Sequence, residues 1–454
     1  MLTRMRPHRD RIRPVHPVLV VLAAMALASP SACSSGASTT RAAIGSAEVV
    51  KANEPRATPA RDDGQRGGDT VQGFAIDAYR QLAAGDGSAN LVFSPYSVVA
   101  ALAMTREGAR GETASQMDHV LHVSDPALLA PAMNGLDGWL SAANRPVKNA
   151  TGGRGEVSLL TANALWAQQG YPIEKPFLST LATQYGSGVH TVDYRRDAEG
   201  ARHQINGWVA DQTKDRIKEL LARGALDDMT RLVLTNAIYL KAPWNVPFAD
   251  GATTKAPFHR VTGGDAPADF MRLDDVLRYA SGDGWQAVTL PYAGRDLAMT
   301  VVVPDAGRLA SFEQRLDPVL LKQVLAEGEN DDVHLKLPKF DLDNHTSVAT
   351  LLKTLGMPLA FDPQKADLSG MAKPAKTGEP PLYVADVIHQ ANITVDEKGT
   401  EAAAATAVMV ETSAAPAPKK PVELTVDRPF LFVVQHVSTH TPVFMGRVTD
   451  PTKK

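Results

Sequence analysis

The chain has little of what marks several common classes of protein. It contains a single cysteine, Cys33, among 454 residues, so no internal disulfide can form and its stability must come from a hydrophobic core. The formal net charge is −3, which argues against a nucleic-acid partner because such proteins usually present a basic face. The apolar run near the start, residues 17–28, has twelve residues, whereas a helix that crosses a bilayer needs about 20.

Catalytic and metal-binding motifs are also missing. The sequence has no G-x-S-x-G, which would indicate a hydrolase nucleophile, and no H-E-x-x-H or cysteine–histidine cluster, which would indicate zinc. His119 and His122 have helical i, i+3 spacing, but no carboxylate partner is evident for them, so we expect them at the surface. We therefore expect neither enzymatic activity nor a metal or other cofactor.

The N-terminus has the features of an export signal. Five arginines precede the apolar run of residues 17–28, and small residues follow it. Cys33 comes next and resembles the acylated cysteine of bacterial lipoproteins, although Pro30 stands where that motif usually has leucine. We expect residues 1–32 to be a signal peptide and Cys33 to be a lipid attachment site, with ordinary secretion as the alternative. The protein would then be exported to the cell envelope and held on the outside of the membrane.

A flexible segment and one domain are expected to follow the signal. Residues 33–69 are rich in Ser, Thr, Ala, Gly and charged residues without sustained periodicity, which predicts a flexible tether. The ordered body is expected to begin near Val71, where apolar residues first recur at helical spacing. Because no internal repeat or linker is evident beyond this point, residues 70–454 are expected to form a single domain.

Helical and strand patterns are distributed unevenly along this domain. Ser94 and Pro95 are typical of an N-cap and a first helical turn, and the helix that they begin should end near Gly108. Apolar spacing from Ile205 to Leu220 outlines a further amphipathic helix. Strands are predicted over residues 232–240, 297–303, 333–337, 388–395 and 429–437. Helices that dominate the first third and strands that dominate the second half are the α+β pattern.

The run VDEKGTEAAAAT, residues 395–406, carries the most information about function. A strand ends at Val395, and only small residues follow Glu401 until Val408. Taken alone, the run is also compatible with an alanine-rich helix or a low-complexity loop, because alanine has the highest helix propensity.

Five stretches, spread over residues 70 to 450, match the motifs of one protein family in order. They are NLVFSPYS (90–97), INGWV (205–209), TNAIYLK (235–241), DEKGTEAAA (396–404), and DRPFLF with PVFMGRV (427–448). In this order they resemble the serpins, a family of serine protease inhibitors. The resemblance implies the serpin fold, with helices packed around a large mixed central β-sheet, two further sheets, and an exposed reactive-centre loop at about residues 397–421.

The resemblance also implies a mechanism. In serpins a protease cleaves the exposed loop, whose N-terminal part then inserts as a new strand of the large sheet and distorts the attached acyl-enzyme. The backbone freedom of Gly399 suits a hinge that must bend, and the even-numbered residues from Thr400 onward are small or apolar, as one buried strand face requires. The hinge residues implied are Glu397, Gly399, Thr400, Glu401, Ala402, Ala403, Ala404, Ala405 and Thr406.

Two further groups are implied by the same resemblance. A hydrogen-bonded cluster called the shutter would lie under the centre of the sheet and contain Ser94, Ser97, Asn236 and His389. Trp244, with Glu397, would mark the breach, where insertion begins. Taken alone, His389 would be interpreted as an ordinary buried histidine whose hydrogen bonds are satisfied.

The scissile bond is placed by counting. The spacing from Gly399 that is usual in inhibitory serpins puts it at Ser413–Ala414, whereas counting back from Pro429 gives about Pro418 because this loop is longer. The rival bonds are Thr412–Ser413, Met409–Val410 and Ala414–Ala415. Small residues in this stretch favour an elastase-like or subtilisin-like target.

We therefore expect an irreversible suicide-substrate inhibitor of serine-type proteases that acts as a monomer. One alternative is a non-inhibitory serpin-fold lipoprotein of the cell surface with a binding or chaperone-like role, and another is an unrelated cell-envelope enzyme. Two departures from the family stand out: Asp215, where glycine is more frequent, and the additional length of residues 414–421. Additional length before the scissile bond, unlike length after it, would turn an inhibitor into a substrate.

Overall fold

The helices come mainly from the first half of the chain, as the apolar periodicity predicted. The computed structural model describes residues 47–374, 380–400 and 420–453, all within one contact unit of the chain. Ser94 caps α2 by accepting a hydrogen bond from the N–H of Ser97, Pro95 occupies the first turn, and the helix ends at Gly108, as predicted. The helices of the described residues are α1 (Asp63–Ala83), α2 (Pro95–Gly108), α3 (Gly111–Val120), α4 (Pro126–Ala142), α5 (Lys175–Tyr185), α6 (Tyr194–Gln212), α7 (Leu309–Arg315), α8 (Pro318–Ala326), α9 (Ala349–Leu355) and the 3-10 turn η1 (Pro358–Phe361).

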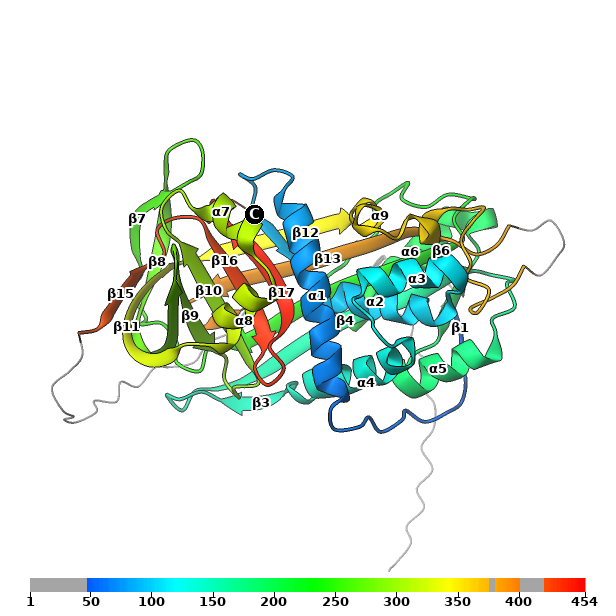
Figure 1. Cartoon of the computed structure of the whole chain (residues 1–454), viewed down its shortest axis with the longest axis horizontal. Coiled ribbons are helices and arrows are strands. Elements are labelled where there is room, and N and C mark those ends of the chain that lie inside the picture. Colours follow the sequence, from blue (N-terminus) through cyan, green and yellow to red (C-terminus); the bar gives the residue numbers. More distant parts are fainter. Residues whose placement is uncertain (1–46, 375–379, 401–419, 454) are drawn as a thin grey trace, which may run out of the picture. The chain divides into compact units, whose positions relative to one another are not determined.

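A large mixed sheet, called sheet A here, lies beside most of these helices (Figure 1). Its strand order is β1-β5-β4-β6-β14-β13-β12, and β3 pairs with β4 off this path. Strands β6 and β13 are parallel and pair directly over most of their length, whereas β4 and β12 flank them in antiparallel orientation. The strands are β1 (Glu48–Val50), β3 (Arg145–Lys148), β4 (Arg154–Gln168), β5 (Val189–Val192), β6 (Leu232–Pro243), β12 (Phe340–Ser347), β13 (Val384–Asp396) and β14 (Gly399–Thr400).

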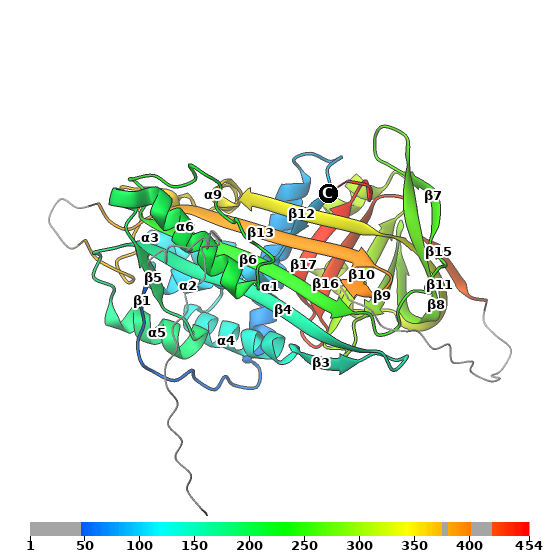
Figure 2. The same cartoon turned by 180° about the vertical axis from the view of Figure 1, so that it is seen from behind.

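The two faces of sheet A are covered differently. Helix α2 packs against β4 and β6 on one face, while α6 crosses the other face, as Figures 1 and 2 show from opposite sides. Along β6 the side chains alternate accordingly. Leu234 and Ile238 belong to the larger hydrophobic core, and Val233 and Ala237 belong to a smaller core under α6. The continuous apolar run of β6 therefore reflects burial on both faces.

A second sheet, called sheet B, contains the remaining strands. Its order is β15-β11-β8-β9-β10-β16-β17-β2, with β7 paired to β8. The strands predicted at residues 297–303, 333–337 and 429–437 are confirmed as β10, β11 and β16. The bounds are β2 (Leu91–Phe93), β7 (Thr254–His259), β8 (Asp265–Gly282), β9 (Trp285–Pro291), β10 (Leu297–Pro304), β11 (Glu329–Pro338), β15 (Val422–Thr425), β16 (Phe430–His436) and β17 (Thr441–Val448).

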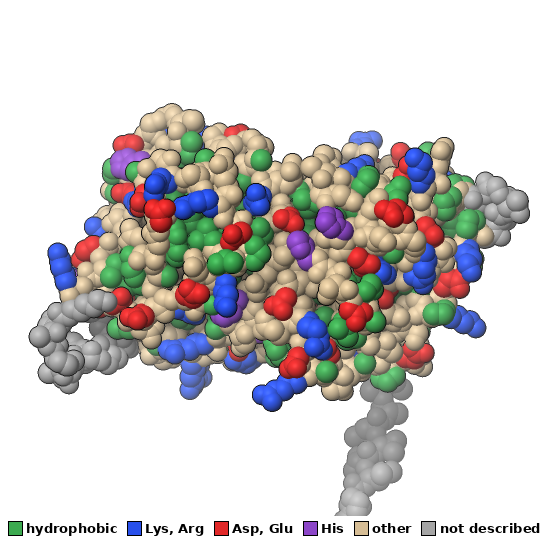
Figure 3. All heavy atoms as spheres, viewed as in Figure 1, with side chains coloured by type: hydrophobic (Ala, Val, Ile, Leu, Met, Phe, Trp, Pro, Cys, Tyr) green, Lys and Arg blue, Asp and Glu red, His purple; other side chains and the backbone are tan. Residues whose placement is uncertain are grey.

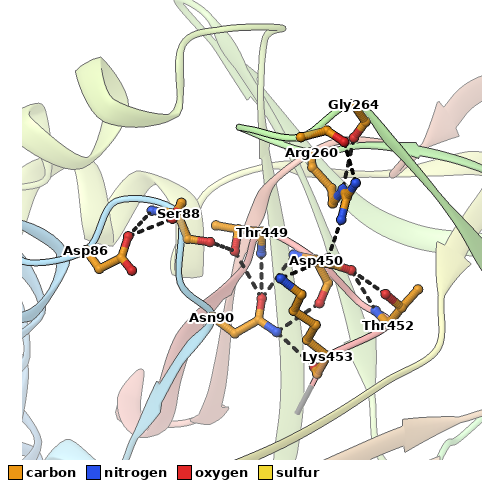
Figure 4. A network of polar contacts seen from close by, with 10 residues as sticks. Asp86, Ser88, Asn90, Arg260, Gly264, Thr449, Asp450, Thr452 and Lys453 are labelled. Carbon is orange, nitrogen blue, oxygen red and sulfur yellow. Dashed lines mark hydrogen bonds and ion pairs between the residues drawn. The ribbon is translucent and has the colours of Figure 1, made fainter.

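Asn90 fastens the C-terminal residues to the segment that precedes β2 (Figure 4). Its Oδ1 accepts hydrogen bonds from the N–H groups of Thr449 at 2.9 Å and Asp450 at 3.0 Å. Its Nδ2 donates to the carbonyl oxygens of Asp450 and Lys453 at 2.8 and 2.9 Å. The Asp450 carboxylate in turn accepts from Arg260, in the turn between β7 and β8, at 3.1 Å. Three segments far apart in the sequence are thus joined.

The prediction of a flexible tether over residues 33–69 was wrong for residues 47–69, while residues 33–46 lie outside the described residues. Residues 47–62 form what is called the strap here: its strand β1 pairs antiparallel with β5 at the edge of sheet A. Farther along the strap, Arg56 forms an ion pair with Asp137 of α4 at 2.6 Å. The segment is polar because it lies at the surface, and its strand and loop are held in place by specific contacts.

Helix α1 also begins earlier than expected, at Asp63. Its first turns lack large apolar residues because glycines make the contact with α4. A Cβ atom on Gly67 would lie 2.6 Å from the carbonyl oxygen of Ala132, and one on Gly135 would lie 2.5 Å from the backbone nitrogen of Gly64. Close backbone approach thus replaced the apolar stripe that periodicity detects.

The helix outlined from Ile205 to Leu220 was predicted too long, because α6 ends at Gln212. Lys214 and Asp215 adopt φ values of 51° and 60°, in the left-handed region that ends a helix. Ile217 and Leu220 nevertheless remain buried in the core under α6. Their apolar spacing therefore predicted buried positions correctly, although these positions lie beyond the end of the helix.

The surface seen in Figure 3 carries charges of both signs. On this face of the described chain, Lys and Arg side chains are interspersed with Asp and Glu and form no continuous basic surface. This distribution agrees with the small net charge of −3.

Candidate functional site

The two-residue strand β14 occupies the end of sheet A between β6 and β13. Gly399 pairs with Pro243 of β6 and Asp396 of β13, and Thr400 pairs with Ala242 and Val395, antiparallel on both sides. Up to Tyr239 and Asn392, β6 and β13 pair directly with each other. The start of the predicted hinge is thus already part of the sheet, at the point where its two central strands diverge.

Gly399 is required at this position by space as well as by conformation. Its φ of 152° lies in a region that side chains disfavour, and a Cβ would approach the carbonyl oxygen of Ala242 to 2.2 Å. No other residue could occupy the position without displacing the backbone of β6. The sequence-based role of Gly399 in the hinge therefore has a steric basis.

Glu397 connects the hinge to two neighbouring elements. Its carboxylate forms an ion pair with Lys339, at the junction of β11 and β12, at 2.8 Å, and accepts a hydrogen bond from the hydroxyl of Thr253 at 2.6 Å. Partial burial on its own would raise the pKa of Glu397, but the hydrogen bonds from Lys339 and Thr253 lower it below its ordinary value. The group is therefore a stable carboxylate that holds the hinge in place.

Trp244 contacts the backbone of the hinge directly. Its backbone N–H donates to the carbonyl oxygen of Lys398 and its indole Nε1–H to that of Asp396, both at 2.9 Å. Its ring is stacked on the ring of Tyr292, with centroids 4.5 Å apart and an interplanar angle of 9°. The Tyr292 hydroxyl lies 2.6 Å from the hydroxyl of Thr400. The predicted breach residues Trp244 and Glu397 are thus brought together around the hinge.

The four predicted shutter residues are all buried and lie in one cluster. The backbone N–H of Ser94 donates to His389 Nε2 at 3.0 Å, so Nδ1 carries the ring proton and donates to Asn236 Oδ1. Asn163 of β4 completes the cluster by accepting from Asn236 Nδ2 at 3.0 Å and from the Ser97 hydroxyl at 2.6 Å. Burial lowers the pKa of His389 to about 3, so its imidazole is neutral.

Sequence reasoning missed four residues of this arrangement. They are Asn163, Thr253, Tyr292 and Lys339. Each acquires its role from a partner that is distant in the sequence, and nothing in its local pattern distinguishes it. Only the three-dimensional structure, which brings each side chain to its partner, identifies them.

Other predicted site residues lie outside the described residues. These are the hinge positions Glu401, Ala402, Ala403, Ala404, Ala405 and Thr406, the bond Ser413–Ala414 and the lipid attachment site Cys33.

Within the described part of the chain, no group of three His, Cys, Asp or Glu side chains could hold a metal ion, and no helix is long and apolar enough to cross a membrane. His122, for which the sequence offered no carboxylate partner, pairs with Asp77 of α1 at 2.8 Å.

The sequence of this chain is similar to those of known proteins of one family. A family model described as "Serpin (serine protease inhibitor)" matches residues 69–451. A serpin-like protein of Thermococcus kodakarensis, named as uncharacterised, is 34% identical over 381 residues, which cover 84% of this chain and 85% of that protein. Leukocyte elastase inhibitor A of Rattus norvegicus is 32% identical over 387 residues, which cover 83% and 97%.

Solved structures give the same result for the fold. The native state of tengpin, a thermophilic serpin, matches with a TM-score of 0.77 and 25% identity over 89% of this chain and 100% of that one. Maspin matches with a TM-score of 0.75 and 22% identity over 86% of this chain and 100% of its own, a likeness of fold alone. These neighbours confirm the predicted arrangement of helices around a large mixed sheet.

Proposed function

The chain belongs to the serpin family, and from this premise we propose that it is an irreversible suicide-substrate inhibitor of serine-type proteases. A protease would cleave the segment that follows Thr400 and remain attached to it as an acyl-enzyme. Insertion of that segment between β6 and β13 would then distort the protease before the ester is hydrolysed. The observation that best supports the proposal is β14, which already lies antiparallel to both strands, as an inserted strand must.

The register of β14 predicts where the following residues would go. Thr400 is fully buried and its hydroxyl contacts Tyr292, so its side chain faces the larger core. Continuing the same register, Glu401 would lie beside the half-buried Lys241, with a compatible charge. Ala402 would lie beside Leu240 and Ile393, which are both buried in the larger core. The sequence therefore alternates between faces as the sheet requires.

The shutter lies on the same path. Six residues after Thr400, the register would bring Thr406 between Asn236 and His389, on the face where those two side chains are hydrogen-bonded. Insertion would have to separate them, which would leave two buried polar groups without partners. A threonine hydroxyl can both donate and accept a hydrogen bond. Thr406 thus supplies a replacement partner at the position where one is needed.

The proposed target is an elastase-like or subtilisin-like protease. Residues 412–415 are Thr, Ser, Ala and Ala, which suit a shallow specificity pocket. Relatives at 32–33% identity are named leukocyte elastase inhibitors. We place the scissile bond at Ser413–Ala414.

The test is incubation of the exported form with elastase-like, subtilisin-like, chymotrypsin-like and trypsin-like proteases, followed by denaturing gels and mass spectrometry. We expect a complex that survives boiling and a released fragment that begins at Ala414. Cleavage without a complex, and without a gain in thermal stability, would contradict the inhibitory mechanism and favour a non-inhibitory binding protein of the cell surface.

We further propose that the protein is exported and anchored to the membrane through Cys33, and that it acts as a monomer. The basic N-terminal region, the apolar run of residues 17–28 and the position of Cys33 support export and anchoring. Incorporation of labelled fatty acid into the wild type and its loss in Cys33→Ser would test it. Equal labelling of both proteins would contradict anchoring at this residue.

A further inference from the structure

Tyr292 provides the polar contact for the buried side chain of Thr400. It follows β9 directly, is fully buried, and its hydroxyl lies 2.6 Å from the hydroxyl of Thr400. Stacking on Trp244 fixes the plane of its ring. Burial raises the pKa of Tyr292 above its ordinary value, so the phenol stays protonated and can donate a hydrogen bond.

The surroundings of Thr400 are otherwise apolar. Its neighbours across the two strands are Ala242 and Val395, both buried. Among the described residues, Tyr292 is the only side chain with which Thr400 forms a hydrogen bond. Because a buried hydroxyl without a partner is costly, this position of the sheet accepts a small residue with a hydroxyl better than any other.

Neighbouring residues of the hinge could not take the same place. A shift of the segment by one residue would present either Gly399, which has no side chain, or Glu401, which carries a charge, to the Tyr292 hydroxyl. The same shift would turn every following side chain to the opposite face of the sheet. The contact between Tyr292 and Thr400 therefore distinguishes one register from its neighbours.

We propose that Tyr292 is a positioning residue that sets the register in which the segment after Gly399 enters sheet A. The inference rests on the proposed function, since it assigns a role within the same insertion. It adds that Thr400 is already aligned with Tyr292 before any protease arrives. Correct alignment at Thr400 then brings each later residue to its position along β6 and β13.

The test is a double-mutant cycle of Tyr292→Phe and Thr400→Val, both of which conserve shape. Each single substitution leaves one buried hydroxyl without a partner, so amide hydrogen exchange of residues 396–400 should rise about tenfold or more. In the double variant both hydroxyls are gone, and exchange should return to within about threefold of the wild type. The stoichiometry of protease inhibition should follow the same pattern, rising in the single variants and recovering in the double one.

Tyr279→Phe is the matched control, because Tyr279 donates a hydrogen bond to Gln286 at 2.9 Å on strands away from the hinge. It should change neither measurement. Additive effects of the two hinge substitutions on hydrogen exchange would overturn the positioning role, whether or not the wild type traps a protease. Coupled exchange in a wild type that traps no protease would support the role of Tyr292 at the hinge and overturn the proposed inhibition instead. Coupled exchange with unchanged stoichiometry would overturn the role in insertion.

Discussion

The Nε2 atom of His389 accepts a hydrogen bond from the backbone N–H of Ser94 at 3.0 Å, which joins strand β13 to the N-terminus of α2. The other ring nitrogen donates to Asn236 of β6. Both bonds require the neutral imidazole with its proton on Nδ1. A second proton, on Nε2, would face the Ser94 N–H and remove an acceptor that the folded protein uses.

Acid is therefore expected to destabilise the folded protein through His389. Burial lowers the pKa of His389 to about 3, compared with 6.5 for an unperturbed histidine. The unfolded chain thus binds more protons between these two values. The contribution of His389 to the free energy of unfolding is fully present above pH 6.5. It falls by up to about 1.4 kcal/mol for each pH unit below that value. Urea unfolding midpoints measured from about pH 7.5 down to about pH 4.5 would show this slope.

His389→Gln is the comparison variant, because it keeps a polar side chain but removes the titrating group. Burial also lowers the pKa of His190, to about 4, so part of the slope should remain in the variant. An identical pH dependence in the two proteins would contradict the assignment to His389.

The burial of Thr400 leads to a second prediction. Under the proposed function, Thr400→Arg should convert the protein from an inhibitor into a substrate, because a charge would have to enter an apolar part of the sheet. We expect the stoichiometry of inhibition to rise about tenfold or more, while cleavage of the loop continues. Titration against a protease of known active concentration measures this number.

Glu401→Gln serves as the control for that substitution, since the register of β14 would place residue 401 on the opposite face. Its stoichiometry should stay close to that of the wild type. If Thr400→Arg inhibits with unchanged stoichiometry, the insertion model is wrong.

The sequence predicted the parts of the fold that local patterns determine. The cap at Ser94, five of the strands and the family motifs around Asn236 and His389 are all visible in short windows. The five strands are those predicted over residues 232–240, 297–303, 333–337, 388–395 and 429–437. The strap escaped prediction because its order depends on pairing with β5 and on Arg56, contacts that leave no periodicity. Tyr292 escaped for the same reason, because its significance comes from Thr400, 108 residues later.

Asp215 gives a third prediction, because its backbone lies in the left-handed region with a φ of 60°. Glycine adopts this conformation without the steric cost that a Cβ imposes. Since the side chain is exposed, Asp215→Gly should raise the free energy of unfolding by about 0.5 kcal/mol. Calorimetry would show a small increase in the unfolding temperature.

Ala210→Gly, inside α6, is the contrasting variant and should lower stability by about 1 kcal/mol. The opposite signs would separate the effect of backbone conformation from the general flexibility of glycine. A loss of stability in both variants would show that Asp215 is not strained.

The strap provides the last prediction, because it covers the edge of sheet A. Strand β1 pairs with β5, and Arg56 contacts both Asp137 and Asn134 of α4, at 2.6 and 2.7 Å. An uncovered edge strand offers unpaired N–H and C=O groups to other chains. A chain that begins at Pro59 should therefore unfold at a lower temperature and self-associate, as measured by sedimentation. Arg56→Ala in the longer chain should lower stability by about 1 kcal/mol without promoting association.

Arg145→Ala is the control for the charge, because Arg145 forms a comparable surface ion pair with Asp296 but lies outside the strap. Its effect should be within about 0.5 kcal/mol. If the shortened chain stays monomeric with an unchanged unfolding temperature, then β5 does not need its cover. In that case β5 must avoid pairing with other chains because it is short: its four residues offer few unpaired N–H and C=O groups.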